Sequence, residues 1–193
     1  MIIRFDETME GLIAFQRHHY ATSPSQQKSR RTQSILFPAI LFTVFTVSAV
    51  LQESPLMFIV GAAAALMIFF SMRGKIDAMH LDAVEKQTRE MFSEGENKVV
   101  FGPRELEVTP EFLVKRSPVH EFIVRWSAVE RIVETLDYGY IYWCGVAAHQ
   151  IPKKQVSKDE YRAFMEAAKS AWEAAKATKS QTAASSLPLP PDS

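Results

Sequence analysis

The fold of this chain is decided by two apolar stretches, Ser34–Leu51 (SILFPAILFTVFTVSAVL) and Leu56–Met72 (LMFIVGAAAALMIFFSM). They contain 18 and 17 residues, and neither holds a charged side chain. At about 1.5 Å per residue, a helix over each would reach roughly 25–27 Å, close to the ~30 Å hydrocarbon core of a bilayer. Apolar residues surround every face, so neither helix keeps the polar stripe of a soluble surface helix. The sequence therefore predicts a membrane α-helical hairpin with spans at 34–51 and 56–72 and an extracytoplasmic turn at 52–55.

The charges of the chain lie almost entirely outside this hairpin. Of 22 basic and 22 acidic residues, only Glu53 falls between residues 34 and 72. The formal net charge of zero argues against a general nucleic-acid binder, which needs a basic surface. The single cysteine, Cys144, excludes an intramolecular disulfide. No cofactor-binding or metal-binding motif is present, so we expect neither group.

Basic residues flank the predicted hairpin on one side, whereas the turn has none. They are Lys28, Arg30 and Arg31 before the first span and Arg73 and Lys75 after the second. By the positive-inside rule they set the topology, which predicts a multi-pass plasma-membrane protein with both termini in the cytoplasm. Small residues allow close packing of the two helices, and the candidates are Ala39, Thr43, Gly61 and Ala65.

The flanking regions have the patterns of water-exposed structure. Residues 1–33 predict a short strand, a helix and a basic linker, and 73–96 predict a connecting helix. Residues 97–177 alternate in short β-rich runs and end in a helix that begins at Ser157-x-x-Glu160. That helix has an apolar stripe. We expect an α+β domain in which a small curved antiparallel sheet is closed by one C-terminal amphipathic helix, as in pleckstrin-homology domains, and a disordered tail at 178–193.

In the order of these elements the chain resembles the YcxB-like membrane proteins of bacteria. The most telling motifs are Trp126-Ser127 and Ile151-Pro152-Lys153, within the longer stretches VRWSAVERIVET and IPKK. The resemblance implies two spans in the bacterial inner membrane and a cytoplasmic pleckstrin-homology-like domain, and it brings no assigned activity. One departure is Phe112, which stands where the family usually has Gly; a positive φ there would strain it.

An aromatic row in the soluble part is the candidate interaction surface. Alternation along a strand places Tyr138, Tyr140 and Tyr142 on one face, with Lys153 and Lys154 as a basic rim. Burial of the row in the core is the competing interpretation. Cys144 and His149 fit no catalytic motif, so we expect no enzyme, although strands can bring distant residues together.

These features predict a non-enzymatic membrane protein whose hairpin anchors a cytoplasmic module. The expected partners are the lipid bilayer, anionic lipid headgroups or a membrane protein, and not nucleic acid. One alternative is a subunit of a membrane complex assembled through the hairpin. The other is a membrane-bound enzyme.

Overall fold

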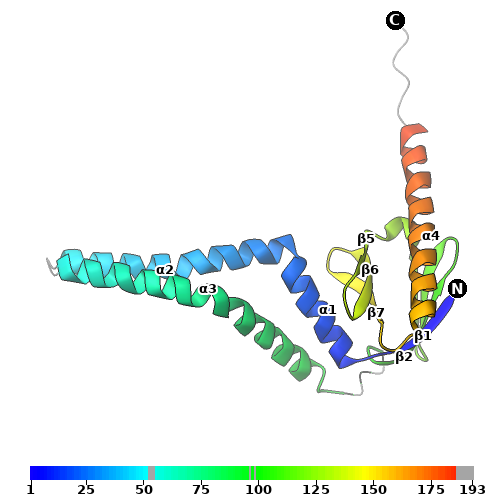
Figure 1. The fold of residues 1–193 in the computed structure, drawn as a ribbon, viewed down its shortest axis with the longest axis horizontal. Coiled ribbons are helices and arrows are strands. Elements are labelled where there is room, and N and C mark those ends of the chain that lie inside the picture. The colour runs from blue at the N-terminus through cyan, green and yellow to red at the C-terminus, as the bar shows by residue number, and fades with distance from the viewer. Residues whose placement is uncertain (52–54, 96, 98, 186–193) are drawn as a thin grey trace, which may run out of the picture. The chain divides into compact units, whose positions relative to one another are not determined.

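The chain divides into two compact units. The computed structural model describes residues 1–51, 55–95, 97 and 99–185. The sheet unit consists of Met1–Leu12 and Gly95–Ser193, and the helical unit of Ile13–Glu94 (Figure 1). Residues 1–12, the first part of the segment predicted at 1–33, therefore belong to the same unit as the C-terminal strands.

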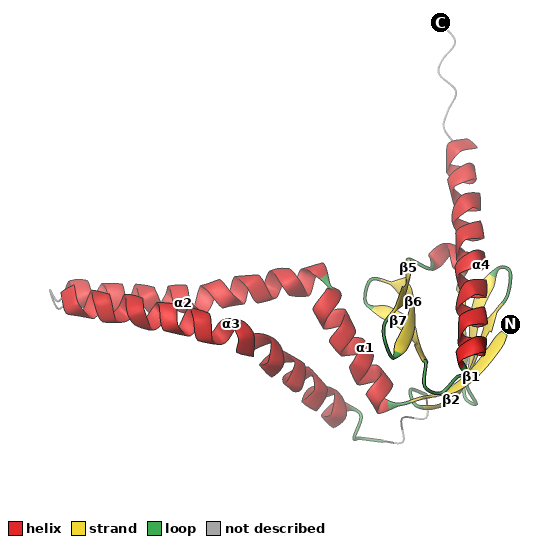
Figure 2. Cartoon of the chain, in the orientation of Figure 1, coloured by secondary structure: helices red, strands yellow, loops and turns green. Residues whose placement is uncertain are grey.

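The sheet unit holds two antiparallel sheets and one long helix (Figure 2). The four-stranded sheet has the order β1-β2-β3-β4 and the three-stranded sheet has the order β5-β6-β7. A short 3-10 turn, η1, joins the sheets. The bounds are β1 Ile2–Glu7, β2 Gly102–Val108, β3 Phe112–Arg116, β4 Glu121–Arg125, η1 Trp126–Ala128, β5 Arg131–Glu134, β6 Tyr138–Cys144, β7 Ala147–Pro152 and α4 Lys158–Ser185.

Strand β1 comes from the N-terminus and pairs with β2, about a hundred residues later in the chain. Its register runs from Ile2 opposite Glu107 to Glu7 opposite Gly102. The alternation of the strand turns Ile3 and Phe5 inward, where both are buried. The N-terminal strand therefore completes the core of the sheet unit.

The core lies between the two sheets and under α4. Ser157 caps α4, because its Oγ accepts from the backbone N–H of Glu160 (3.3 Å) and donates to the Glu160 carboxylate (2.6 Å). Trp126 is fully buried and donates from Nε1 to the Thr109 carbonyl oxygen (2.9 Å). The stripe of α4 that enters the core is Tyr161, Phe164, Met165 and Ala168, with Trp172 and Ala175 partly buried beside it.

The helical unit is built on two long helices that run side by side (Figure 1). The long helices are α2 Pro24–Leu51 and α3 Pro55–Met91; the shorter α1, Met9–Thr22, begins within the residues of the sheet unit and continues into this one. A Cβ added to Gly61 of α3 would lie 2.3 Å from the Cβ of Phe45 in α2, so only glycine permits this approach. Ala65 and Ala49 are also buried, whereas Ala39 and Thr43 are exposed. Two of the four predicted packing residues, Gly61 and Ala65, therefore lie in buried positions.

The predicted transmembrane hairpin is wrong. Across the described residues, no helix combines enough length with enough apolar character to cross a bilayer. The physical reason lies in how each helix is composed. The apolar runs reach only roughly 25–27 Å, below a ~30 Å hydrocarbon core. Each run continues without a break into a polar or charged half, at 24–33 in α2 and 73–91 in α3.

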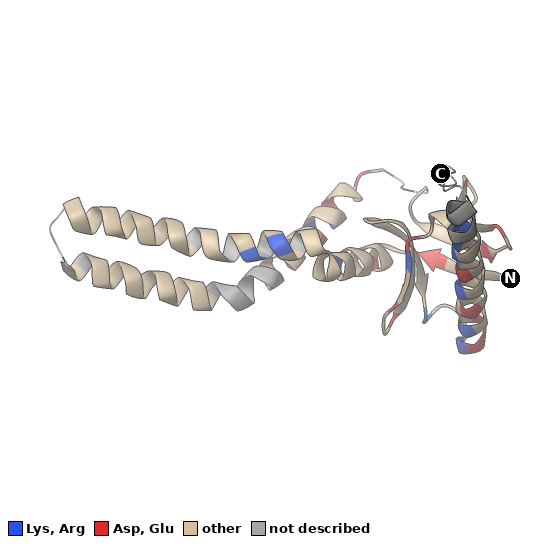
Figure 3. Ribbon diagram, turned by 90° about the horizontal axis from the view of Figure 1, so that it is seen from above, with Lys and Arg blue, Asp and Glu red and all other residues tan. Residues whose placement is uncertain are grey.

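The predictions that depended on these two spans are therefore also wrong. They are the membrane anchor, the multi-pass plasma-membrane location with cytoplasmic termini, and both membrane-bound alternatives. The basic residues Lys28, Arg30, Arg31, Arg73 and Lys75 lie within α2 and α3, so they no longer set a topology. The uncharged halves of both helices (tan in Figure 3) expose large apolar side chains, among them Ile40, Val47, Phe58, Leu66 and Phe70.

The predicted fold of the flanking regions also needs correction. There are two sheets instead of one curved sheet, because the chain turns inward at buried Trp126 and β5 pairs with β6, not with β4. Within the segments predicted at 1–33 and 73–96, residues 24–33 are helical as part of α2 and residues 73–91 as part of α3. Helix α4 continues to Ser185; the turn at 52–54 and the end of the predicted tail lie outside the described residues.

Candidate functional site

A pocket of about 340 Å³ lies beside α4 in the sheet unit; we call it the α4 pocket. Its volume falls in the range of small-ligand sites. Tyr161 and Met165, both core residues, supply its apolar part. The other lining residues are charged: Glu134, Lys153, Lys158, Arg162, Glu166 and Lys169.

Glu134, at the end of β5, organises one side of the α4 pocket. Its carboxylate accepts from the Lys169 ammonium (2.7 Å) and the Tyr161 hydroxyl (3.0 Å), and Lys153 Nζ lies 3.5 Å away. The hydrogen bond from Lys169 is the main cause that lowers the pKa of Glu134. Burial raises the pKa of Tyr161, which keeps its hydroxyl protonated as a donor. Glu134 therefore holds two cationic side chains in place.

The lining of the α4 pocket as a whole has an excess of positive charge. Four basic side chains and two acidic ones line it. Among the described residues Lys158 has no ion-pair partner, and Arg162 has only a long contact with Asp159 (3.8 Å). Lys158, Arg162 and Lys169 follow α4, whose charged residues are visible in Figure 3. The pocket is therefore an elongated site that favours anions.

Most of the predicted tyrosine row is not at the surface. Tyr140 and Tyr142 are 1% and 0% exposed, and Tyr138 is half-buried. The rings of Tyr138 and Tyr140 stack with centroids 6.0 Å apart, and Arg131 lies 4.0 Å above the ring of Tyr142. Burial raises the pKa of Tyr142, and Arg131 opposes that shift. These tyrosines pack inside the protein, as the competing interpretation held.

The two predicted rim lysines have different surroundings. Lys153 lines the α4 pocket, donates to the Thr135 carbonyl oxygen (2.7 Å) and lies 5.1 Å from the Tyr161 ring centre. Lys154 is exposed and forms an ion pair with Asp137 (2.9 Å) outside the pocket. Only the first of them therefore belongs to the candidate site.

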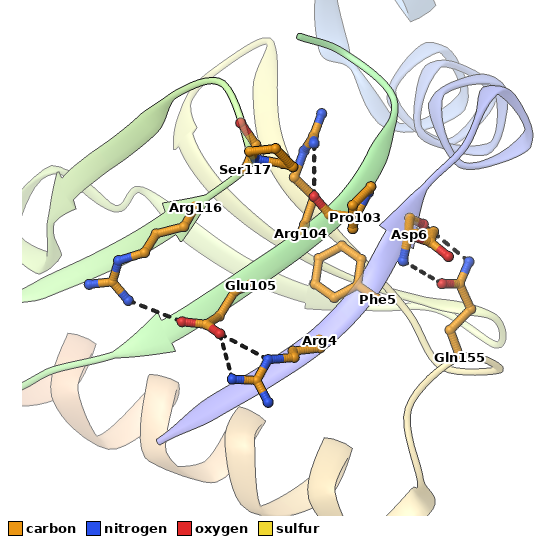
Figure 4. A pocket seen from close by; sticks show the side chains of 10 residues that line it. Arg4, Phe5, Asp6, Pro103, Arg104, Glu105, Arg116, Ser117 and Gln155 are labelled. Atoms are coloured by element: carbon orange, nitrogen blue, oxygen red, sulfur yellow. Dashed lines mark hydrogen bonds and ion pairs between the residues drawn. The ribbon is translucent and has the colours of Figure 1, made fainter. Parts of the chain in front are cut away.

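A second pocket, of about 560 Å³, borders β1, β2 and the β3–β4 turn (Figure 4). Its arginines are all paired with glutamates, and Arg104 pairs with Glu7 outside the pocket. Glu105 accepts from Arg4 (2.9 Å) and Arg116 (3.3 Å), and Arg116 also contacts Glu107 (2.6 Å). The main chain of Asp6 exchanges two hydrogen bonds with Gln155. These pairs form a cross-strand ladder that stabilises the sheet and leaves little charge for a ligand.

Cys144 and His149 do not form a catalytic pair in the described structure. His149 is 2% exposed, and its ring packs against Trp143 (4.4 Å) and Phe122 (5.5 Å). Neither ring nitrogen has a hydrogen-bond partner among the described residues. In the same part of the chain, no group of His, Cys, Asp and Glu side chains has the arrangement of a metal site. His149 is therefore a buried neutral side chain.

The buried histidine makes the stability of the sheet unit depend on pH. Burial and, secondarily, Lys115 lower the pKa of His149 well below 6.5. The unfolded chain therefore binds a proton more readily than the folded one below about pH 6.5. The contribution of neutral His149 to the free energy of unfolding should therefore be fully present above that pH. Below it, the free energy of unfolding should fall by at most about 1.4 kcal/mol per pH unit. Urea unfolding at several pH values between about 5 and 6.5 should show that the free energy of unfolding of His149→Phe changes less with pH than that of the wild type.

The matched control for this prediction is His120→Asn. His120 is half-buried, and its ring bonds the Ser117 hydroxyl (2.7 Å). This variant should keep the slope of the wild-type protein. An unchanged slope in His149→Phe would show that other groups cause the acid sensitivity.

The sheets, α4 and its pocket thus define an α+β domain with an anion-favouring site. Residues 108–168 of this domain match the family model described as YcxB-like protein. The resemblance seen in the sequence is confirmed for this region; the membrane architecture that it implied is not. No curated protein and no solved structure gives a match. The matched region contains every lining residue of the α4 pocket except Lys169.

Most of the α4 pocket could not be predicted from the sequence. Lys153 was a predicted site residue, whereas Glu134, Lys158, Arg162 and Lys169 were not. The spacing of Lys158 and Arg162, one helical turn apart, was a usable signal, because such residues share a helix face. Nothing local places Glu134 beside Lys169, since that contact depends on how α4 packs on the sheets.

Proposed function

We propose that the sheet unit is a recognition domain without catalytic activity and that the α4 pocket binds an acidic segment of a partner protein. The observation that carries this proposal is the row of basic side chains along α4, with Glu166 as the one acidic member, beside the apolar parts of Tyr161 and Met165. From Lys158 to Lys169 the row extends about 16 Å along the helix. Electrostatic complementarity of this kind gives specificity and faster association.

The length of the basic row favours a peptide over a single phosphate group. A compact phosphate would contact one end of the row only. An extended segment of about six residues spans ~20 Å and presents successive side chains on opposite sides. Acidic side chains would meet Lys158, Arg162 and Lys169, and apolar ones would meet Tyr161 and Met165. A mixed acidic and apolar segment therefore fits both parts of the pocket.

The described lining favours binding over catalysis. It contains no Ser, Cys or His that would serve as nucleophile or base. Its more central carboxylate, Glu134, is held by Lys169, Tyr161 and Lys153. Its pKa is lowered, which makes it a poor proton donor at neutral pH.

Fluorescence anisotropy tests this proposal with the full chain and a labelled peptide of alternating Glu and Leu. The double variant Lys158→Glu, Arg162→Glu should bind about tenfold or more weakly, because two attractive charges become repulsive. The matched control is Lys154→Glu, which alters an exposed lysine outside the pocket and should bind as the wild type does.

Three results would contradict the proposal. The control could lose as much affinity as the double variant, which would indicate a general charge effect. A peptide of alternating Gln and Leu could bind equally well. Inorganic phosphate at concentrations that leave ionic strength unchanged could displace the peptide, which would identify a phosphate site.

A further inference from the structure

The interior of the sheet unit is apolar at one end and charged at the other. Under α4, Leu106, Leu113 and Ile151 are fully buried. Further along the same inner faces lie Arg104, which is 2% exposed, and Lys115 of the neighbouring strand. Charged side chains are rarely buried unless they are paired, so this end of the core needs an explanation.

The buried charges do not balance. The carboxylate of Glu7 accepts from Arg104 Nε (2.8 Å) and also from Lys115 Nζ. One carboxylate therefore serves two cations, which leaves one positive charge without a counter-charge in this cluster. Burial lowers the pKa of Lys115, and Glu7 opposes that shift. A further anion would relieve this imbalance.

Arg104 has a structural role that accounts for its burial. Its NH1 donates to the Pro103 carbonyl oxygen (3.0 Å) and its NH2 to the Val99 carbonyl oxygen (2.9 Å). The guanidinium thus ties the segment before β2 to Glu7 of β1. No such role accounts for Lys115, which donates only to Glu7 among the residues described. An ammonium has three donors, so two remain for a ligand.

A cavity of about 180 Å³ lies next to Lys115 and Glu7. Its polar wall includes Thr8 and Gln150, and within the described structure the Gln150 amide has no hydrogen-bond partner. Thr8 Oγ1 accepts from the Gly11 N–H (3.2 Å), so its own hydroxyl proton is available. Apolar side chains also line it, namely those of Leu12, Val99, Val100, Phe101 and Ala148.

We propose that this cavity binds a short-chain monocarboxylic acid as its anion. The carboxylate would pair with Lys115 and accept from Gln150, which balances the charge of the cluster. The hydrocarbon chain would contact Leu12, Val100 and Phe101. The cavity is smaller than the ~300 Å³ typical of larger ligands, so only a few carbon atoms fit.

Isothermal titration calorimetry of the full chain with sodium butyrate tests this site. The protein should bind butyrate at least about tenfold more tightly than butyramide, which lacks the charge. Lys115→Met should weaken butyrate binding by a similar factor. Gln150→Leu keeps Lys115 and Glu7 intact, so it tests the site even if Lys115→Met fails to fold; it should weaken binding several-fold.

Two controls separate this site from the α4 pocket. Lys154→Met should leave butyrate binding unchanged. The Lys158→Glu, Arg162→Glu variant should also bind butyrate normally while it loses the acidic peptide, so either proposal can fail alone. The carboxylate site would be overturned if butyramide bound as well as butyrate or if Gln150→Leu had no effect. It would also be overturned if chloride competed at equal concentration, since the site would then recognise charge alone.

Discussion

Replacing Trp126 by alanine should lower the free energy of unfolding of the sheet unit by about 3–5 kcal/mol. The side chain is fully buried at the turn between the two sheets, within the cluster that α4 covers. Its loss would leave a cavity and would also leave the Thr109 carbonyl oxygen without its 2.9 Å hydrogen bond. Urea unfolding followed by tryptophan fluorescence measures the effect.

Tryptophan fluorescence reports on the sheet unit alone, because all three tryptophans of the chain lie in it. The variant retains Trp143 and Trp172 as probes. In Trp126→Phe the free energy of unfolding should fall by less, since an aromatic ring still fills most of the space. Ser127→Ala is the control, because Ser127 is exposed and adjacent. A loss below about 1 kcal/mol in Trp126→Ala would mean that this residue does not join the sheets.

Replacing Gly61 by leucine should separate α2 from α3 in the helical unit. Even the first carbon of a side chain at this position would lie 2.3 Å from Cβ and 2.7 Å from Cγ of Phe45. Neither helix can accommodate the larger side chain without moving its backbone. We therefore expect the free energy of unfolding of the helical unit to fall by about 3 kcal/mol or more. Hydrogen exchange should become faster across the facing segments, 39–49 and 58–68.

Ala63→Leu is the matched control for this variant. Ala63 lies two residues away on the same helix but is exposed, so the larger side chain meets no neighbour there. Its exchange should match that of the wild type. Equal protection from hydrogen exchange in Gly61→Leu and Ala63→Leu would show that the close approach at Gly61 does not hold α2 and α3 together.

The sequence predicted the local elements of the sheet unit well. The short β-rich runs predicted within residues 97–177 form strands β2–β7, since alternation and turn residues are local signals. The apolar spacing of the last helix identified the face that enters the core. Phe112 causes no strain, because its φ is not positive and the turn closes by hydrogen bonds with Thr109.

Features that depend on distant contacts or on whole helices were not predictable from local sequence patterns. The pairing of β1 with β2 joins residues about a hundred apart, and no local pattern indicates it. Composition alone suggested spans at 34–51 and 56–72, whereas α2 and α3 extend through polar residues on one side of each run. Alternation placed the tyrosines on one face and left open whether that face is exposed or buried; Tyr140 and Tyr142 are buried.

The claim that the α4 pocket recognises acidic segments is tested most directly by reversing the charge of the pocket and the charge of the peptide. The Lys158→Glu, Arg162→Glu variant and the wild-type chain would each be titrated with two labelled peptides, one alternating Glu and Leu and one alternating Lys and Leu. The account predicts that the wild type prefers the acidic peptide and that the variant prefers the basic one. A variant that still prefers the acidic peptide, or that binds neither peptide differently from the wild type, would contradict it.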